Sequence, residues 1–140
     1  MRHLKSGLKL SRTPSHRKAM FRNMVTSLLE YGYIKTTDVK AKEVGRLTEK
    51  IVTLAKKGDL HARRRALAFV RDKRVIHKFF EEALTLYGSR NGGYTRITKI
   101  GYRPGDSAPM SLVELIDVEK KIKGKGKESD KKSSKSKKEE

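Results

Sequence analysis

The strongest constraint on the fold is a helical repeat of apolar residues near the start of the chain. Phe21, Met24, Val25 and Leu28 are spaced three and four residues apart, which places them on one side of an α-helix. The pair Thr13-Pro14 has the residue types of a helix cap and a first helical position, and Gly32 is of the type that ends a helix. The sequence therefore predicts an amphipathic helix that begins at Pro14 and stops at Gly32.

The same spacing predicts three more helices. The second begins near Asp38 and stops at Gly58, the third is capped by Asp59, and the fourth is capped by Asp72 and ends at Gly88. Their apolar positions are Val44, Leu47, Thr48, Ile51, Leu54 and Ala55 in the second helix, Leu60, Leu67 and Val70 in the third, and Val75, Ile76, Phe79, Phe80, Ala83 and Tyr87 in the fourth.

Three segments have the alternation or composition of β-strands. Residues 33–36 form a short β-prone run, and residues 94–100 and 110–116 alternate on either side of the turn-rich GYRPGDSAP. Helices followed by strands are typical of an α+β fold with helices packed against a small sheet. At 140 residues the chain is long enough for one such domain, which we place at residues 1–119.

The charge of the chain indicates its partner. Lys and Arg number 35 against 16 acids, and the formal net charge of +19 predicts binding to a polyanion, of which nucleic acid is the leading candidate. Cysteine is absent, which excludes disulfides and thiolate metal sites. No apolar run approaches the roughly 18 residues of a membrane-spanning helix, so we expect no membrane partner.

The two ends of the chain differ from its middle. Residues 120–140 hold ten lysines and one apolar residue, Ile122, so we expect a disordered Lys-rich tail. A solvating extension is the favoured interpretation of this tail, and a sequence-specific role is the alternative. Residues 1–12 carry cations, glycine and serine without a helical stripe, which predicts an extended basic arm that becomes ordered on RNA, or else a merely solvated terminus.

The sequence offers little for catalysis. Neither GxxxxGK[ST] nor GxGxxG occurs, and the four histidines, His3, His16, His61 and His77, lack a metal-ligand spacing. Asp59 and His61 could be imagined as a hydrolytic pair, but Asp59 also stands where a helix needs its cap, and the cap interpretation is favoured. We therefore expect no enzyme activity, no metal, no cofactor and no small-molecule substrate.

Three successive arginines in the predicted third helix are candidates for binding nucleic acid. Arg63, Arg64 and Arg65 are successive helical positions about 100° apart, so they fan over a broad surface. A solvated helix face is the alternative interpretation, although Asp72 and Asp59 are too far along the helix to pair with Arg64.

The stretch RNGGYTRITKIGYRPGD, residues 90–106, combines charge, glycines and aromatic rings. Gly92 and Gly93 permit a sharp turn or the close approach of a phosphate, and Tyr94 and Tyr102 offer rings for stacking on unpaired bases. The alternative is a glycine hinge that leads into a strand with core tyrosines. The candidate RNA-binding residues are Arg2, His3, Lys5, Lys9, Arg12, His16, Arg17, Arg22, Arg63, Arg64, Arg65, Arg90, Gly92, Gly93, Tyr94, Arg96, Lys99 and Arg103.

Several motifs, in order along the chain, carry a resemblance to a known family. They are MRH, SHRKAMFRNM, IKTT, AKE, IVTLAKKGDLHARR, NGGYTRI and RPGDSAPMSLVEL. Over residues 1–117 the chain resembles the bacterial large-subunit ribosomal protein family numbered seventeen, and only the tail departs from it. The presence of family motifs in the acid-free N-terminus disfavours a transit peptide there.

The resemblance implies a cytoplasmic, structural component of the large ribosomal subunit. It implies binding to large-subunit ribosomal RNA near the outlet of the nascent-chain tunnel, beside neighbouring ribosomal proteins, in support of assembly and translation. It also implies two layers, with about four helices on a small mixed three-stranded sheet.

Two other classes of function remain compatible with the charge. A DNA-compacting protein would need an element that fits a DNA groove, and a nuclease would cleave RNA with the help of a metal. Competition between duplex DNA and large-subunit RNA, and incubation of RNA with magnesium, would distinguish these classes.

Overall fold

The computed structural model describes residues 8–116, which form four helices and three strands. The order is α1 (Pro14–Tyr31), β1 (Tyr33–Thr37), α2 (Asp38–Lys57), α3 (Leu60–Phe69), α4 (Lys73–Tyr87), β2 (Thr95–Tyr102) and β3 (Pro109–Leu115). The predicted α+β class is confirmed. The expected Lys-rich tail at residues 120–140 and the first seven residues of the expected arm lie outside the described residues.

The helix ends lie where the caps predicted them. Gly32 and Gly58 have positive φ angles of 81° and 68°, and their amides donate to the carbonyls of Leu28 and Leu54, closing α1 and α2. The Asp59 carboxylate accepts from the amide of Ala62 at 2.6 Å, so it acts as the cap of α3. Asp72 caps α4 in the same way, accepting from the amide of Arg74 at 2.8 Å.

The sheet is antiparallel throughout, which corrects the expected mixed sheet. Its strand order is β1-β3-β2, and both neighbouring pairs run antiparallel. Val113 of the central strand lies opposite Ile34 of β1 and Ile97 of β2. Strand direction and order arise from long-range pairing, which the local alternation of residues does not encode.

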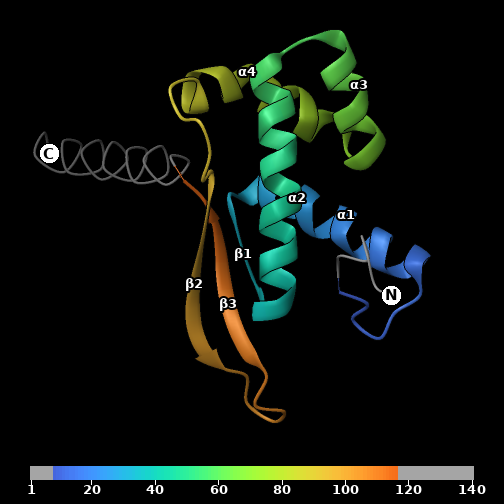
Figure 1. The fold of residues 1–140 in the computed structure, drawn as a ribbon, viewed down its shortest axis with the longest axis vertical. Helices are drawn as coiled ribbons and strands as arrows, with labels where there is room; N and C mark the ends of the chain where they lie inside the picture. Colours follow the sequence, from blue (N-terminus) through green and yellow to red (C-terminus); the bar gives the residue numbers. More distant parts are fainter. Residues whose placement is uncertain (1–7, 117–140) are drawn as a thin grey trace, which may run out of the picture.

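The helices cover one face of the sheet. Ser111, Val113 and Leu115 alternate along β3 as buried residues, whereas Leu112 and Glu114 between them are only half-buried. The buried side chains join a core to which all four helices contribute. Figure 1 shows α2 as the central helix beside the sheet, with α3 and α4 toward one end and the β2–β3 hairpin extending past the other.

The third helix packs differently from its predicted apolar side. Leu60 is 63% exposed and Leu67 is half-buried, while the small Ala62 and Ala66 are fully buried. Val70, just after the helix, is buried as expected. Alanine lets a helix backbone approach its neighbours closely, so α3 packs through the side that carries Ala62 and Ala66. The prediction relied on large apolar residues and therefore did not identify this side.

Gly45 marks the close approach of α2 to the sheet. A Cβ atom at this position would lie 3.3 Å from the Thr95 Oγ1 atom and 3.5 Å from the Ile97 Cδ1 atom. The residue is buried, so a larger side chain has no free space to enter. The absence of a side chain therefore sets the distance between α2 and β2.

We expect Gly45→Leu to lower the free energy of unfolding by about 1–3 kcal/mol, because it forces α2 away from β2. Urea unfolding followed by circular dichroism measures the change. Thr53→Leu, at an exposed position on the same helix, is the control and should change stability by no more than ~0.5 kcal/mol. Equal stability of the two variants would contradict the close-packing account.

Candidate nucleic-acid interface

The loop between α4 and β2, residues 88–94, is held at both ends by side chains; we call it the glycine loop. The Arg90 carbonyl accepts from the Lys56 ammonium and from the Tyr94 hydroxyl, the latter at 3.1 Å. The Tyr94 ring is buried and packs edge-on against Tyr87, with the ring centroids 5.4 Å apart. Tyr94 thus follows the alternative interpretation, in which the tyrosine belongs to the core. Its ring is inaccessible to a base, and its hydroxyl holds the loop in place.

Gly92 and Gly93 are the exposed tip of this loop. Gly93 has φ +63°, a conformation that residues with a Cβ rarely adopt, while Gly92 does not share this restriction. Nothing lies within 4 Å of the position that a Cβ would take at either glycine. The loop therefore presents bare backbone to open space, while Arg90 donates from its guanidinium to the Gly93 carbonyl at 3.3 Å.

One side of helix α2 lies beside the glycine loop; we call it the α2 wall, and it consists of Arg46, Glu49, Lys50 and Thr53. A shallow pocket of about 330 Å³ lies between them, lined by Arg46, Glu49, Lys50, Thr53, Asn91, Gly92 and Tyr94. Arg46 pairs with Glu43 at 3.1 Å and keeps a side chain that is 61% exposed, and Lys50 is also exposed. The only acid in the lining, Glu49, accepts from the Thr95 hydroxyl at 3.3 Å.

Arg46 and Lys50 were not among the predicted site residues. A signal for them exists in the sequence, because Lys42, Arg46 and Lys50 recur every four residues and so share one side of the helix. That this side lies next to the glycines depends on the packing of α2 against β2.

Strand β2 continues from the glycine loop along the edge of the sheet. Every β2 residue after Thr95 is exposed, including Arg96 and Lys99. The register shifts between Lys99 and Gly101, and beyond this bulge Tyr102 is 76% exposed. Arg96 lies opposite Glu114 of β3 and has an interaction of its own, so it is not a free cation. Tyr102, rather than Tyr94, offers a ring for stacking.

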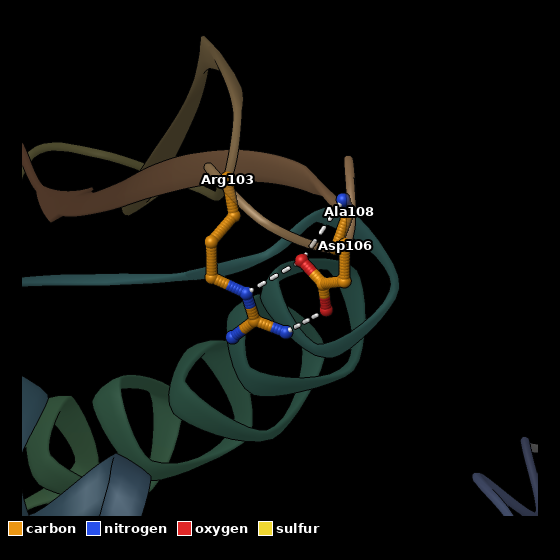
Figure 2. Close-up of polar contacts among 3 residues, drawn as sticks. All are labelled: Arg103, Asp106 and Ala108. Carbon is orange, nitrogen blue, oxygen red and sulfur yellow. Dashed lines mark hydrogen bonds and ion pairs between the residues drawn. The ribbon is translucent and has the colours of Figure 1, made fainter.

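Arg103 is engaged within the turn of the β2–β3 hairpin. Figure 2 shows its guanidinium side by side with the Asp106 carboxylate, and the two nitrogen-to-oxygen distances are 3.0 and 2.6 Å. The same carboxylate accepts from the Ala108 amide at 3.3 Å. The hydrogen bonds from Arg103, followed by the one from Ala108, lower the pKa of Asp106 from 3.8 to about 2. Arg103 thus shapes the turn, and its charge is largely matched by Asp106.

We expect the Asp106 carboxyl to titrate near pH 2, because Arg103 stabilises its ionised form. A lowered pKa means that this interaction favours the folded hairpin above the ordinary pKa of 3.8 and is lost as the pH falls toward 2. A carboxyl-carbon NMR titration measures the midpoint. Arg103→Gln should return it toward the ordinary value, and an unchanged midpoint in that variant would contradict the assignment.

A second group of predicted cations lies at the start of α1. Arg17 donates to the carbonyls of Lys9 and Arg12 at 3.1 and 3.2 Å, and an Arg12 guanidinium nitrogen lies 2.8 Å from the His16 Nε2 atom. Residues 9–12 form a turn, with positive φ angles at Leu10 and Ser11, rather than the expected extended arm. The predicted contacts Arg2, His3 and Lys5 lie outside the described residues.

The predicted arginines of α1 and α3 have different environments. Arg22 donates to the Ala68 carbonyl at 2.8 Å, and its guanidinium lies 6.0 Å from the centre of the Phe69 ring, so it ties α1 to α3. Arg63 lies over Phe80 at 5.5 Å and is half-buried. Arg64 and Arg65 are exposed. The sequence predicted a cationic surface made by all three arginines of α3, but only Arg64 and Arg65 present it.

Residues 8–116 contain neither a candidate membrane span nor a candidate metal site. No helix there is long and apolar enough to cross a membrane. No group of three or more His, Asp or Glu side chains in this region is placed to hold a metal ion.

The chain is similar to known proteins over most of its length. The family model described as Ribosomal protein L17 matches residues 20–116. Proteins called large ribosomal subunit protein bL17 are 64% identical over 118 residues in Desulfosudis oleivorans, 63% over 116 in Desulforapulum autotrophicum and 60% over 116 in Syntrophus aciditrophicus. These alignments cover 84%, 83% and 83% of this chain, and 57%, 97% and 93% of the three relatives. The chain thus spans less than two thirds of the Desulfosudis protein.

Proposed function

The chain belongs to the ribosomal protein L17 family, and from this membership we propose that it binds large-subunit ribosomal RNA through the glycine loop, the α2 wall and strand β2. The family is a structural, non-enzymatic part of the large ribosomal subunit, which places the chain in the bacterial cytoplasm, in the ribosome. The proposal concerns the RNA contact and its support of subunit assembly and translation.

The observation that carries the proposal is the exposure of residues 91–93 and 96–102, on either side of the buried Tyr94 and the half-buried Thr95. Bare glycine backbone, the cations Arg46, Lys50 and Lys99, and the ring of Tyr102 follow one another on neighbouring elements. Backbone amides and cations contact phosphates, and an exposed aromatic ring stacks on an unpaired base. Asp106, near the end of this surface, is paired with Arg103, which reduces its repulsion of phosphate.

The anchoring of the glycine loop supports the same proposal. The contacts of Lys56 and Tyr94 with the Arg90 carbonyl hold the loop before any ligand arrives. A loop that is already ordered loses less conformational entropy on binding than a free one. We propose that Arg64, Arg65 and the cations at the start of α1 provide further phosphate contacts. We also propose that the chain lies near the tunnel outlet beside other ribosomal proteins, as the family resemblance implies.

A competition experiment tests the proposal. The full chain is bound to a labelled large-subunit RNA fragment, and either the same unlabelled fragment or duplex DNA of equal phosphate content is added at physiological salt. We expect the RNA fragment to compete at a concentration at least roughly tenfold lower than the DNA, since specific contacts add to phosphate attraction. Equal competition would contradict specific binding to ribosomal RNA, and cleavage of the fragment in magnesium would contradict a purely structural role.

We expect deletion of residues 120–140 to leave the fold and the RNA preference intact. This segment has almost no apolar surface to bury, while its ten lysines attract phosphates without selecting a sequence. Thermal melting and RNA binding of the shortened chain check the two parts of the prediction. Affinity for unrelated RNA at low salt should fall, and a collapse of thermal stability would show that the boundary at residue 119 is wrong.

A further inference from the structure

A groove lies between the end of α1 and the length of α4, apart from the candidate RNA interface. Its volume is about 350 Å³, and its lining consists of Leu29, Glu30, Asp72, Arg74, Val75, Lys78, Phe79, Glu82 and Leu86. Leu29 and Phe79 are buried in its floor at 9% and 6% exposure, and Val75 and Leu86 are half-buried. The groove therefore has an apolar floor that is partly accessible to a partner.

Helix α4 presents two sides with different roles. Ile76, Phe80, Ala83 and Tyr87 are buried in the core. Val75, Phe79, Glu82 and Leu86 recur at spacings of four, three and four residues, which aligns them along the groove. The stripe runs from residue 75 to residue 86, and its eleven residue steps span about 16 Å at the rise of an α-helix, which is the length of three helical turns. This geometry suits an amphipathic helix that lies alongside α4.

The rim of the groove is acidic in a protein that is otherwise strongly basic. Three carboxylates, those of Glu30, Asp72 and Glu82, stand against two cations in the lining, whereas the whole chain has a net charge of +19. One of the two cations, Arg74, pairs with Asp72 at 3.4 Å. The hydrogen bond from the Arg74 amide is the main cause that lowers the pKa of Asp72, so this carboxylate stays ionised at neutral pH.

We propose that this groove binds an amphipathic helical segment of a neighbouring protein, with apolar residues toward Leu29, Val75 and Leu86 and with cations toward Glu30. RNA is the less suitable occupant, because its phosphates would face the carboxylates of the rim. Proteins that coat RNA are rich in Lys and Arg, and such a partner matches the charge of this rim. The proposal rests on the proposed function only for the setting, the assembled large subunit.

A photo-crosslinking experiment in assembled large subunits identifies the occupant. The chain carries the photoreactive residue p-benzoylphenylalanine in place of Val75, which lines the groove. A control chain carries it in place of Leu84, a 64% exposed residue of α4 that is outside the lining. We expect the Val75 position to join a ribosomal protein at a segment with apolar residues three and four apart and an excess of Lys and Arg, and the Leu84 position not to join that segment.

Charge reversal at the rim separates a protein partner from RNA by the sign of its effect. Glu30 is exposed, so Glu30→Lys leaves the core unchanged, and Glu81→Lys makes the same charge change on an exposed position outside the groove. We expect Glu30→Lys to lower the yield of the protein adduct per incorporated chain roughly fivefold, and Glu81→Lys to leave it unchanged. If RNA occupied the groove, Glu30→Lys would instead raise the yield of an RNA adduct.

The outcomes decide the proposal separately from the proposed function. Four results would each overturn the proposal of a cationic helix. They are an adduct with RNA, an adduct with a second copy of this chain, no adduct at Val75, and a protein adduct whose yield is unchanged by Glu30→Lys. RNA binding by the free Glu30→Lys chain, measured by the competition experiment above, should equal or slightly exceed that of the parent. Failure of that binding in the parent chain would count against the RNA interface and not against the groove.

Discussion

Raising the salt concentration from about 50 to about 200 mM lowers the affinity of the chain for large-subunit RNA by on the order of 1,000-fold. Each phosphate that a cation neutralises releases counterions and contributes roughly 0.7–0.9 to the log-log slope. The exposed cations of the proposed RNA contacts are Lys9, Arg46, Lys50, Arg64, Arg65 and Lys99. Together they give a slope of roughly −4 to −5.

The measurement is a binding isotherm at several salt concentrations, made with the chain that lacks residues 120–140 so that the Lys-rich tail does not contribute. Lys50→Ala should reduce the magnitude of the slope by nearly one phosphate contact, about 0.7–0.9. Lys73→Ala, at an exposed lysine at the start of α4 outside the proposed contacts, is the matched control and should leave the slope unchanged. A flat response to salt would rule out the phosphate contacts.

Gly93→Val weakens RNA binding more than Lys99→Ala does, by roughly tenfold or more against roughly two- to fourfold. At φ +63° a β-branched residue is strained by ~1–3 kcal/mol, so the loop adopts another shape and the bare backbone is no longer presented in place. Loss of Lys99 removes one salt-dependent phosphate contact and leaves the shape of the loop unchanged.

Two further variants separate backbone strain from close approach. Gly92→Val adds the same side chain to an exposed neighbour without a positive φ, so any loss of binding reports the approach of RNA to the loop. Gly93→Asn adds a side chain that tolerates the left-handed conformation better than valine does. Circular dichroism and thermal melting of each variant show whether β2 remains in place. If Gly93→Val folds like the parent and binds RNA equally well at physiological salt, the two glycines are only a hinge.

The sequence determined the parts of this protein that depend on neighbouring residues. The apolar repeat of α1, the glycines that end α1 and α2, and the Asp59 and Asp72 caps defined helices within a residue or two of their ends. These signals are local, because a cap or a helical side is set by residues three or four positions apart. The motifs shared with the ribosomal protein family likewise identified the family without any structure.

Only the tertiary structure decided the order of the strands and the use of individual side chains. The antiparallel order β1-β3-β2 pairs residues as far apart as Tyr33 and Glu114. Tyr94 faces the core and Tyr102 the solvent, although both are tyrosines of one cationic stretch. Whether a cation ties helices together, as Arg22 does, or stays exposed, as Lys50 does, depends on which distant groups folding brings within hydrogen-bonding reach, and a one-dimensional pattern of charges carries no such distances.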